Sequence, residues 1–270
     1  MSHISESLPI GIFDSGVGGL TVMKEIVSRL PGEDILYLGD TARVPYGVRS
    51  PETVLKYSIE NTEFLISVGI KLLVVACNTS SAVSLEVLRK KFPLPVIGVV
   101  EPGARAAVHM TRTKKVAVIG TETTIQSGSY ERAIKSIDPS ISVSGTACPL
   151  FVPLIEEGWI DGEVVNLTAE KYLFPVKDSG ADTLVLGCTH YPMIKDVIQA
   201  RVGITLIDSA VETAREVENV LHRQGMLRSG RGQVKRKFFV TDAPDKFVRT
   251  GERFLDHPVS DIIKINLDDV

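Results

Sequence analysis

Cysteine is scarce in this chain, with three residues among 270. Such an odd, low number argues against the disulfide framework of small secreted domains, so we expect free thiols and a cytoplasmic location. No apolar run approaches the ~18 residues of a membrane span. The opening segment Met1–Pro9 also lacks the basic and apolar regions of a secretory signal. We therefore expect no membrane association.

An excess of positive charge is also missing, because the formal net charge is −3 at pH 7. No global field therefore attracts nucleic acid or an anionic membrane. The segment Met226–Lys237 does hold several Lys and Arg residues among glycines and serine, but no aromatic residue interleaves with them. This pattern favours a solvated surface loop over a nucleic-acid patch. We expect no nucleic-acid partner.

Short apolar runs alternate with segments of helical period along the whole chain, which is typical of an α/β protein with mainly parallel sheets. Two sets of four expected strands follow one another at a nearly constant interval, which indicates a duplicated unit. The expected strands are Ile10–Phe13, Ile35–Leu38, Leu72–Ala76, Val96–Val99, Val116–Ile119, Ile141–Val143, Leu184–Leu186 and Ile204–Ile207.

Two later strands, Phe238–Thr241 and Ile262–Asn266, follow a second unit that is already complete. We expect this tail to pack back on the first half. The predicted domains are residues 1–98 with 210–270, and residues 99–209. Among the helices, Ser50-Pro51-Glu52 predicts an N-terminus, Ser209–Glu212 predicts a capping box, and Gly225 predicts the end of that second helix.

Two of the expected strands end in a cysteine and polar residues, Cys77-Asn78-Thr79 and Cys188-Thr189-His190. Ligands of open α/β sheets bind beyond the carboxyl ends of the strands, and a helix N-terminus there lowers a thiol's pKa. A cysteine closing a buried strand is usually a small core residue. Two at duplicated positions favour a chemical role instead, whereas Cys148 keeps the structural interpretation.

Other polar clusters are expected at the same sheet edges, including Asp14-Ser15-Gly16, Gly39-Asp40-Thr41 and Thr121. Helix N-termini beside them would suit a small anion. Asp14 either caps a helix or acts at the strand end. His190 could be a satisfied polar residue, a metal ligand or a general acid or base. Because no Cys-x-x-Cys or His-x-x-x-His is present, we expect no metal.

Six segments carry recognisable motifs: Phe13–Leu20, Gly39–Gly47, Ala76–Ala82, Gly98–Gly103, Pro153–Gly158 and Gly187–Pro192. Together they resemble glutamate racemase, a cofactor-independent family that supplies D-glutamate for bacterial cell-wall peptidoglycan synthesis. The Asp-Ser-Gly and Pro-Tyr-Gly motifs distinguish glutamate racemase from the other members of a wider racemase superfamily.

This resemblance implies two pseudo-symmetric α/β domains with the active site in the cleft between them, no cofactor, and often a homodimer. Cys77 would take the α-proton from D-glutamate and Cys188 from L-glutamate. Asp14 and His190 would assist them, with Glu156 as a further acid. The implied substrate-holding residues are Asp14, Ser15, Pro45, Tyr46, Gly47, Asn78, Thr79, Thr121, Thr189 and His190.

Three alternatives remain open at this point. The first is a racemase of the same superfamily that acts on aspartate or a hydantoin. The second is a non-catalytic binding module for an acidic amino acid. The third is a nucleotide-binding protein built on the glycine loop Gly16–Leu20, although this loop lacks the lysine of a phosphate loop and the third glycine of a dinucleotide fingerprint.

Overall fold

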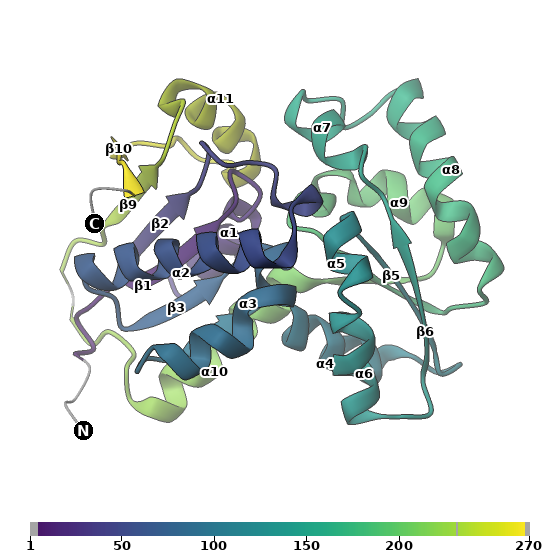
Figure 1. Ribbon diagram of the computed structural model, residues 1–270, viewed down its shortest axis with the longest axis horizontal. Coiled ribbons are helices and arrows are strands. Elements are labelled where there is room, and N and C mark those ends of the chain that lie inside the picture. The colour runs from purple at the N-terminus through teal and green to yellow at the C-terminus, as the bar shows by residue number, and fades with distance from the viewer. Residues whose placement is uncertain (1–4, 231, 268–270) are drawn as a thin grey trace.

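Two parallel β-sheets form the framework of the protein in the computed structural model, which describes residues 5–230 and 232–267 (Figure 1). In spatial order the first sheet contains β10 (Ile262–Lys264), β9 (Arg236–Val240), β2 (Ile35–Gly39), β1 (Ile10–Asp14), β3 (Leu72–Val75) and β4 (Val96–Gly98). The second contains β6 (Ser142–Ala147), β5 (Lys115–Gly120), β7 (Thr183–Gly187) and β8 (Thr205–Asp208). The predicted α/β class is confirmed.

Helices connect the strands and cover the sheets. Those before β6 are α1 (Leu20–Arg29), α2 (Pro51–Val68), α3 (Asn78–Lys91), α4 (Val100–Met110), α5 (Glu122–Gln126) and α6 (Ser129–Ile137). Those after it are α7 (Phe151–Glu156), α8 (Glu163–Asp178), α9 (Lys195–Val202), α10 (Ser209–Gln224) and α11 (Pro244–Leu255). Among the described residues, no helix is both long enough and apolar enough to cross a bilayer.

The predicted duplication is visible in the strand orders. The sheets share the arrangement in which the first strand of each unit lies between the second and the third, followed by the fourth: β2-β1-β3-β4 and β6-β5-β7-β8. The registers correspond too, since Ile10 pairs with Ile35 in one sheet and Val116 pairs with Val143 in the other. Two copies of one unit therefore build the protein.

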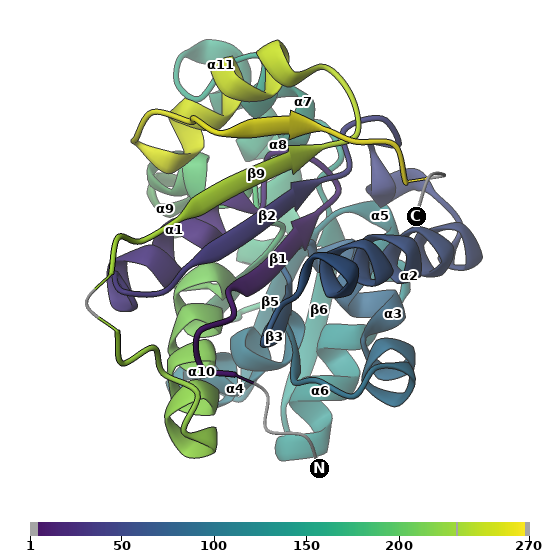
Figure 2. The ribbon, with the colours of Figure 1, turned by 90° about the vertical axis from the view of Figure 1, so that its left-hand side faces the viewer.

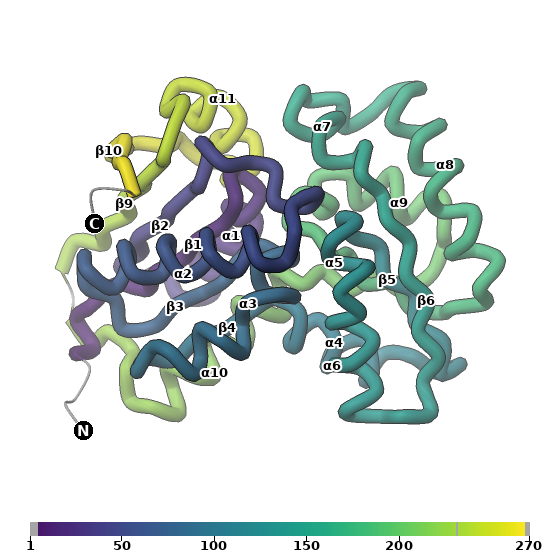
Figure 3. The backbone as a smooth tube through the Cα atoms, viewed as in Figure 1, coloured from purple at the N-terminus to yellow at the C-terminus, as the bar shows by residue number. Residues whose placement is uncertain are grey.

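The C-terminal strands join the first sheet, as predicted for the tail. In β9, Phe238 pairs with Tyr37 of β2, and β10 then adds at the edge (Figure 2). Before them, α10 packs against both α1 and α4, so it contacts both halves (Figure 3). The domain boundaries at residues 98/99 and 209/210 stay predictions.

Strand side chains alternate between two apolar layers, as expected of a sheet covered on both faces. Ile12 and Val74 belong to one buried cluster, while Phe13 and Val75 belong to another on the opposite face. The first cluster continues into the second half through Leu184 of β7 and its neighbours. A shared core therefore fixes how the two sheets face each other.

Two of the three helix-end predictions are confirmed. The Ser50 side chain accepts a hydrogen bond from the Thr53 N–H at the start of α2, and Gly225 ends α10 in a left-handed conformation. The capping box at Ser209 is wrong. Asp208 caps α10 instead, and its carboxylate accepts from the Ala210 N–H at 2.9 Å, because Ser209 already donates to the Leu186 carbonyl.

The basic segment Met226–Lys237 is less solvated than predicted. Arg228 pairs with Asp34 at 3.1 Å and donates to the Gly32 carbonyl at 3.0 Å. The last two residues of the segment, Arg236 and Lys237, already belong to β9. The carboxylate of Asp34 accounts for the difference, because it offers an ion-pair partner that sequence reading alone could not place beside this segment.

Candidate active site

A cleft of about 310 Å³ opens where the carboxyl ends of the two sheets meet. Both halves contribute to it, and every predicted site residue lines it except Asp14. The predicted residues in the lining are Ser15, Pro45, Tyr46, Gly47, Cys77, Asn78 and Thr79 from the first half, and Thr121, Glu156, Cys188, Thr189 and His190 from the second. The volume suits a small ligand.

The two cysteines enter the cleft from equivalent strands of the two units. Cys77 follows β3 after one residue and is the N-cap of α3, while Cys188 directly follows β7. Both side chains are largely buried, although both line the cleft. One thiol from each half therefore reaches the same small cavity. Cys148 does not line it and lies fully buried in the core.

Cys77 lies in surroundings that disfavour its charged form. Burial, with a smaller contribution from the nearby Asp14 carboxyl, raises the pKa of Cys77 to about 11, against hydrogen bonds from Ser80 and Ser15 that lower it. Its sulfur lies 3.7 Å from the Ser15 hydroxyl. The expected lowering of the thiol pKa at this helix N-terminus is wrong, because desolvation outweighs the helix-end contribution.

Cys188 does not lie at a helix N-terminus, so that part of the prediction is also wrong. The chain continues through a turn into the 3₁₀ segment η2 (Tyr191–Ile194), and α9 begins only at Lys195. In place of a helix end, the sulfur has the His190 ring, with Nδ1 at 3.9 Å.

His190 is held between Cys188 and Glu156. Burial lowers the pKa of His190, but hydrogen bonds to these two side chains outweigh it and raise the pKa to about 10. Its Nε2 lies 3.2 Å from Glu156 Oε1. Burial raises the pKa of Glu156, but the hydrogen bond to His190 outweighs burial, so the net effect is a lowered pKa. Both shifts favour an imidazolium on His190 paired with a carboxylate on Glu156.

Asp14 lies beneath the cleft, where it is 1% exposed. Burial raises the pKa of Asp14, against the attraction of His190 and the N–H groups of Gly16 and Gly19. Its Oδ2 accepts from the Gly16 N–H at 2.9 Å, whereas Oδ1 has no hydrogen-bond partner among the described residues. The two thiols thus have unlike neighbours, an acid near Cys77 and a cation beside Cys188.

Two threonine hydroxyls of the cleft wall contact a third threonine, Thr124, which is buried behind them. Thr79 Oγ1 lies 3.0 Å from Thr121 Oγ1 and 3.3 Å from Thr124 Oγ1, and Thr121 also caps α5. Sequence reasoning missed Thr124. Its signal was the Thr-x-x-Thr spacing, since residues three apart at a helix start share one side.

Asp40 holds the loop that carries Pro45, Tyr46 and Gly47 in place through hydrogen bonds. This fully buried carboxylate accepts from the Tyr46 hydroxyl and from Arg43 Nε at 2.7 Å. Its second oxygen accepts from the Thr241 hydroxyl at 2.9 Å. Asp40, one of the polar residues singled out from the sequence, therefore supports the cleft without lining it.

The glycine loop serves close packing within the chain. A Cβ built on Gly18 would lie 2.4 Å from Thr189 Oγ1 and 2.5 Å from the His190 ring. The loop of the first half therefore lies directly against the Cys188-Thr189-His190 segment of the second. This contact accounts for the glycine without the nucleotide-binding interpretation.

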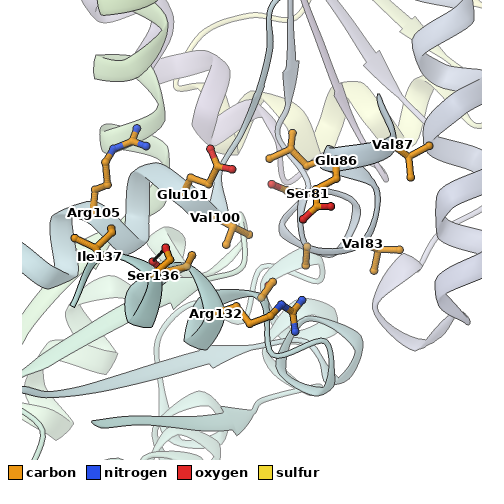
Figure 4. Close-up of a pocket in the computed structure, with 14 residues that line it drawn as sticks. Ser81, Val83, Glu86, Val87, Val100, Glu101, Arg105, Arg132, Ser136 and Ile137 are labelled. Carbon is orange, nitrogen blue, oxygen red and sulfur yellow. Dashed lines mark hydrogen bonds between the residues drawn. The ribbon is translucent and has the colours of Figure 1, made fainter. Parts of the chain in front are cut away.

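A larger hollow of about 660 Å³ lies between α3, α4 and α6 (Figure 4). Neither cysteine nor histidine is among its lining residues. Two of its charged side chains are paired, Arg105 with Glu216 and Glu101 with Arg89. Across residues 5–230 and 232–267, no group of three or more His, Cys, Asp or Glu residues could hold a metal ion. The thiol chemistry therefore points to the smaller cleft.

The fold and the cleft define a class of protein: a duplicated α/β protein that brings one thiol from each half to a shared cavity. A model of the Asp/Glu/hydantoin racemase family matches residues 10–217. A glutamate racemase of Geobacter metallireducens is 55% identical over 261 residues, which cover 96% of this chain and 97% of that protein.

Solved structures give the same result. The glutamate racemase of Francisella tularensis in complex with D-glutamate matches with a TM-score of 0.94 and 38% identity, covering 98% of this chain and 100% of that one. The isoform RacE1 from Bacillus anthracis matches with a TM-score of 0.93 and 42% identity, covering 96% and 98%. The chain belongs to the glutamate racemases of the Asp/Glu/hydantoin racemase family, and it is an amino-acid racemase.

Proposed function

We propose that this enzyme interconverts L- and D-glutamate by a two-base proton transfer between Cys77 and Cys188. The observation that carries the proposal is the convergence of one thiol from each half on one small cleft. Racemisation removes the α-proton on one face and returns a proton on the other. Bases fixed on both faces achieve this without turning the substrate.

One thiol and one thiolate are needed at the start, and they exchange roles in each turnover. When Cys188 accepts the α-proton, Cys77 gives its own proton to the opposite face, and the reverse reaction uses the opposite assignment. His190 holds a proton beside Cys188, and Asp14 lies near Cys77. We propose these two residues, with Glu156 behind His190, as the auxiliary groups of the two sulfurs.

The α-proton of an amino acid is very weakly acidic, so the charge that develops on removal must be stabilised in place. The cleft lining contains no lysine that could form a Schiff base. It offers instead the N-terminus of α3 and the hydroxyls of Thr79, Thr121 and Thr189. Donors already oriented toward a carboxylate supply electrostatic stabilisation without a cofactor.

Glutamate is proposed as the substrate because the relatives of this chain are named glutamate racemases and the Francisella tularensis protein was solved with D-glutamate. The proposed substrate-holding set is that given by the motifs, with Ser15, Pro45, Tyr46 and Gly47 on one wall. We also propose, from the family resemblance, a cytoplasmic homodimer that supplies D-glutamate for peptidoglycan.

The test is racemisation of each glutamate enantiomer in deuterated water without added cofactor, followed by circular dichroism and by deuterium at the α-carbon. Cys77→Ser and Cys188→Ser should each lose at least ~10³-fold in kcat, because each removes a group that acts as base or acid in every turnover. Cys148→Ala is the matched control and should keep near-normal turnover. Near-normal racemisation by either serine variant would refute the two-thiol assignment.

A further inference from the structure

The side-chain amide of Asn78 is hydrogen-bonded on one side only. Asn78 is 2% exposed, and its Oδ1 accepts a hydrogen bond from the Tyr130 hydroxyl at 2.6 Å. Its Nδ2 is buried and has no partner among the described residues. Buried polar atoms in native proteins nearly always have a partner, so an unpaired donor in a ligand cleft indicates a contact with the ligand.

Tyr130 is suited to act only as a donor in this pair. Burial raises the pKa of Tyr130 above its ordinary value, so the phenol keeps its proton. The ring is also confined, because Cβ atoms built on Gly103 and Gly187 would lie 3.4 Å and 3.2 Å from it. A fixed phenol that donates selects the amide orientation in which oxygen faces the phenol and nitrogen faces away.

The hydrogen bond between Tyr130 and Asn78 also joins the two halves of the protein next to Cys77. Asn78 is the first residue of α3 and directly follows Cys77, whereas Tyr130 belongs to α6 of the second unit. The phenol therefore acts on the cleft from outside, since Asn78 lines the cleft and Tyr130 does not.

We propose that Tyr130 is a positioning residue: its phenol holds Asn78 Oδ1 so that Nδ2 is presented to a carboxylate oxygen of the substrate. The inference rests on the proposed function, because it takes glutamate as the ligand. With the opposite amide orientation, a carbonyl oxygen would face the carboxylate and repel it. Tyr130 thus favours substrate binding without touching the substrate.

Tyr130→Phe keeps the ring and removes the donor. Loss of one buried hydrogen bond should raise KM about tenfold for both enantiomers and leave kcat within about twofold, because the contact is made equally in ground and transition states. Tyr172→Phe is the matched control, since its hydroxyl contacts the Leu150 N–H and not Asn78. This control should keep the wild-type KM.

A second variant distinguishes the role of the Asn78 Nδ2 donor from that of the Oδ1 acceptor. Asn78→Asp keeps an oxygen for the phenol but loses the Nδ2 donor, so KM should rise at least as much as in Tyr130→Phe. In an Asn78→Ala background, Tyr130→Phe should add no further rise. A purely structural role would instead lower the melting temperature of Tyr130→Phe at unchanged KM.

The outcomes distinguish this inference from the function on which it rests. If the wild-type enzyme racemises glutamate but Tyr130→Phe keeps the wild-type KM, the positioning role alone is refuted. Additive effects of Tyr130→Phe and Asn78→Ala would refute it as well. If the wild-type enzyme does not racemise glutamate, the proposed function fails and the inference fails with it.

Discussion

Substituting Gly18 by alanine tests whether the glycine loop fixes the Cys188-Thr189-His190 segment across the cleft. The new Cβ would lie 2.5 Å from His190 Nδ1, whereas ordinary contacts begin at 3.4 Å, so one partner must move by about 0.9 Å. Sliding is restricted because the Thr21 hydroxyl contacts the carbonyls of both Gly18 and Thr189, each at 2.9 Å. A misplacement near 1 Å costs roughly 10²-fold in rate, so kcat should fall about a hundredfold.

The loss should be unequal between the two sulfurs. Gly18 lies against Thr189 and His190, on the side of Cys188, and not against Cys77. Elimination from an N-hydroxylated glutamate analogue needs only one base, so its two enantiomers report on the two thiols separately. The elimination assigned to Cys188 should fall with racemisation, and the one assigned to Cys77 should persist.

Gly32→Ala is the control, because a Cβ at that position has no atom within 4 Å. It should leave kcat and the melting temperature unchanged. If Gly18→Ala keeps kcat within about threefold of wild type, the reasoning from steric displacement is wrong. If both eliminations fall equally, the damage is general and the assignment of this loop to one sulfur is wrong.

Two further predictions concern charge. In Glu156→Gln the pKa of His190 should fall below about 10, because one of the hydrogen bonds that raise it is weakened. The imidazolium is lost as the pH rises through that pKa, so kcat/KM should decline at lower pH than in the wild type. An unchanged pH profile would contradict this. Lys71→Met should lower the free energy of unfolding in urea by about 3 kcal/mol, because it leaves the buried Glu33 carboxylate without the ammonium group that lies 2.5 Å away. The value of kcat should be unchanged. A loss of less than about 1 kcal/mol would contradict this prediction.

The sheets could be predicted from the sequence because their strands are buried on both faces. Such strands appear as continuous apolar runs, and all five residues of β1 and of β7 are buried. The carboxyl ends of parallel strands then fall at one edge, so the polar residues after each run converge. Cys77 and Cys188 could therefore each be placed at the carboxyl edge of a sheet, whereas the shared cleft between the two halves was implied by the resemblance to glutamate racemase.

Local signals failed where tertiary partners decide. Ser209 has the letters of a capping residue, but the Leu186 carbonyl takes its hydroxyl and Asp208 caps the helix. Tyr130 lies in a helix of unremarkable sequence, and only its contact with Asn78 gives it significance. Leu186 is too far from Ser209 in the sequence, and Asn78 too far from Tyr130, for residue spacing to reveal either contact.

The sequence predicted a lowered pKa for Cys77, which is the wrong direction, and a helix N-terminus at Cys188, which is the wrong local structure. A helix end does follow Cys77, but burial outweighs it and raises the pKa. After Cys188 the chain passes through a turn and a 3₁₀ segment, and α9 begins only at Lys195. Desolvation depends on everything packed around a group, and no local pattern of residues measures that.

The two halves share a scaffold but not their auxiliary groups. His190 follows Cys188 by two residues, where the first half has Thr79, and Asp14 ends β1 where the second half has Gly120 at the end of β5. For the proposed reaction this asymmetry is permitted, because L- and D-glutamate have equal free energies in water. The equilibrium constant is therefore one and kcat/KM must be equal in both directions, however different the two sulfurs are. Between the two directions, kcat and KM can therefore differ only in the same proportion, so selection on the overall reaction does not require the second half to copy the acid of the first.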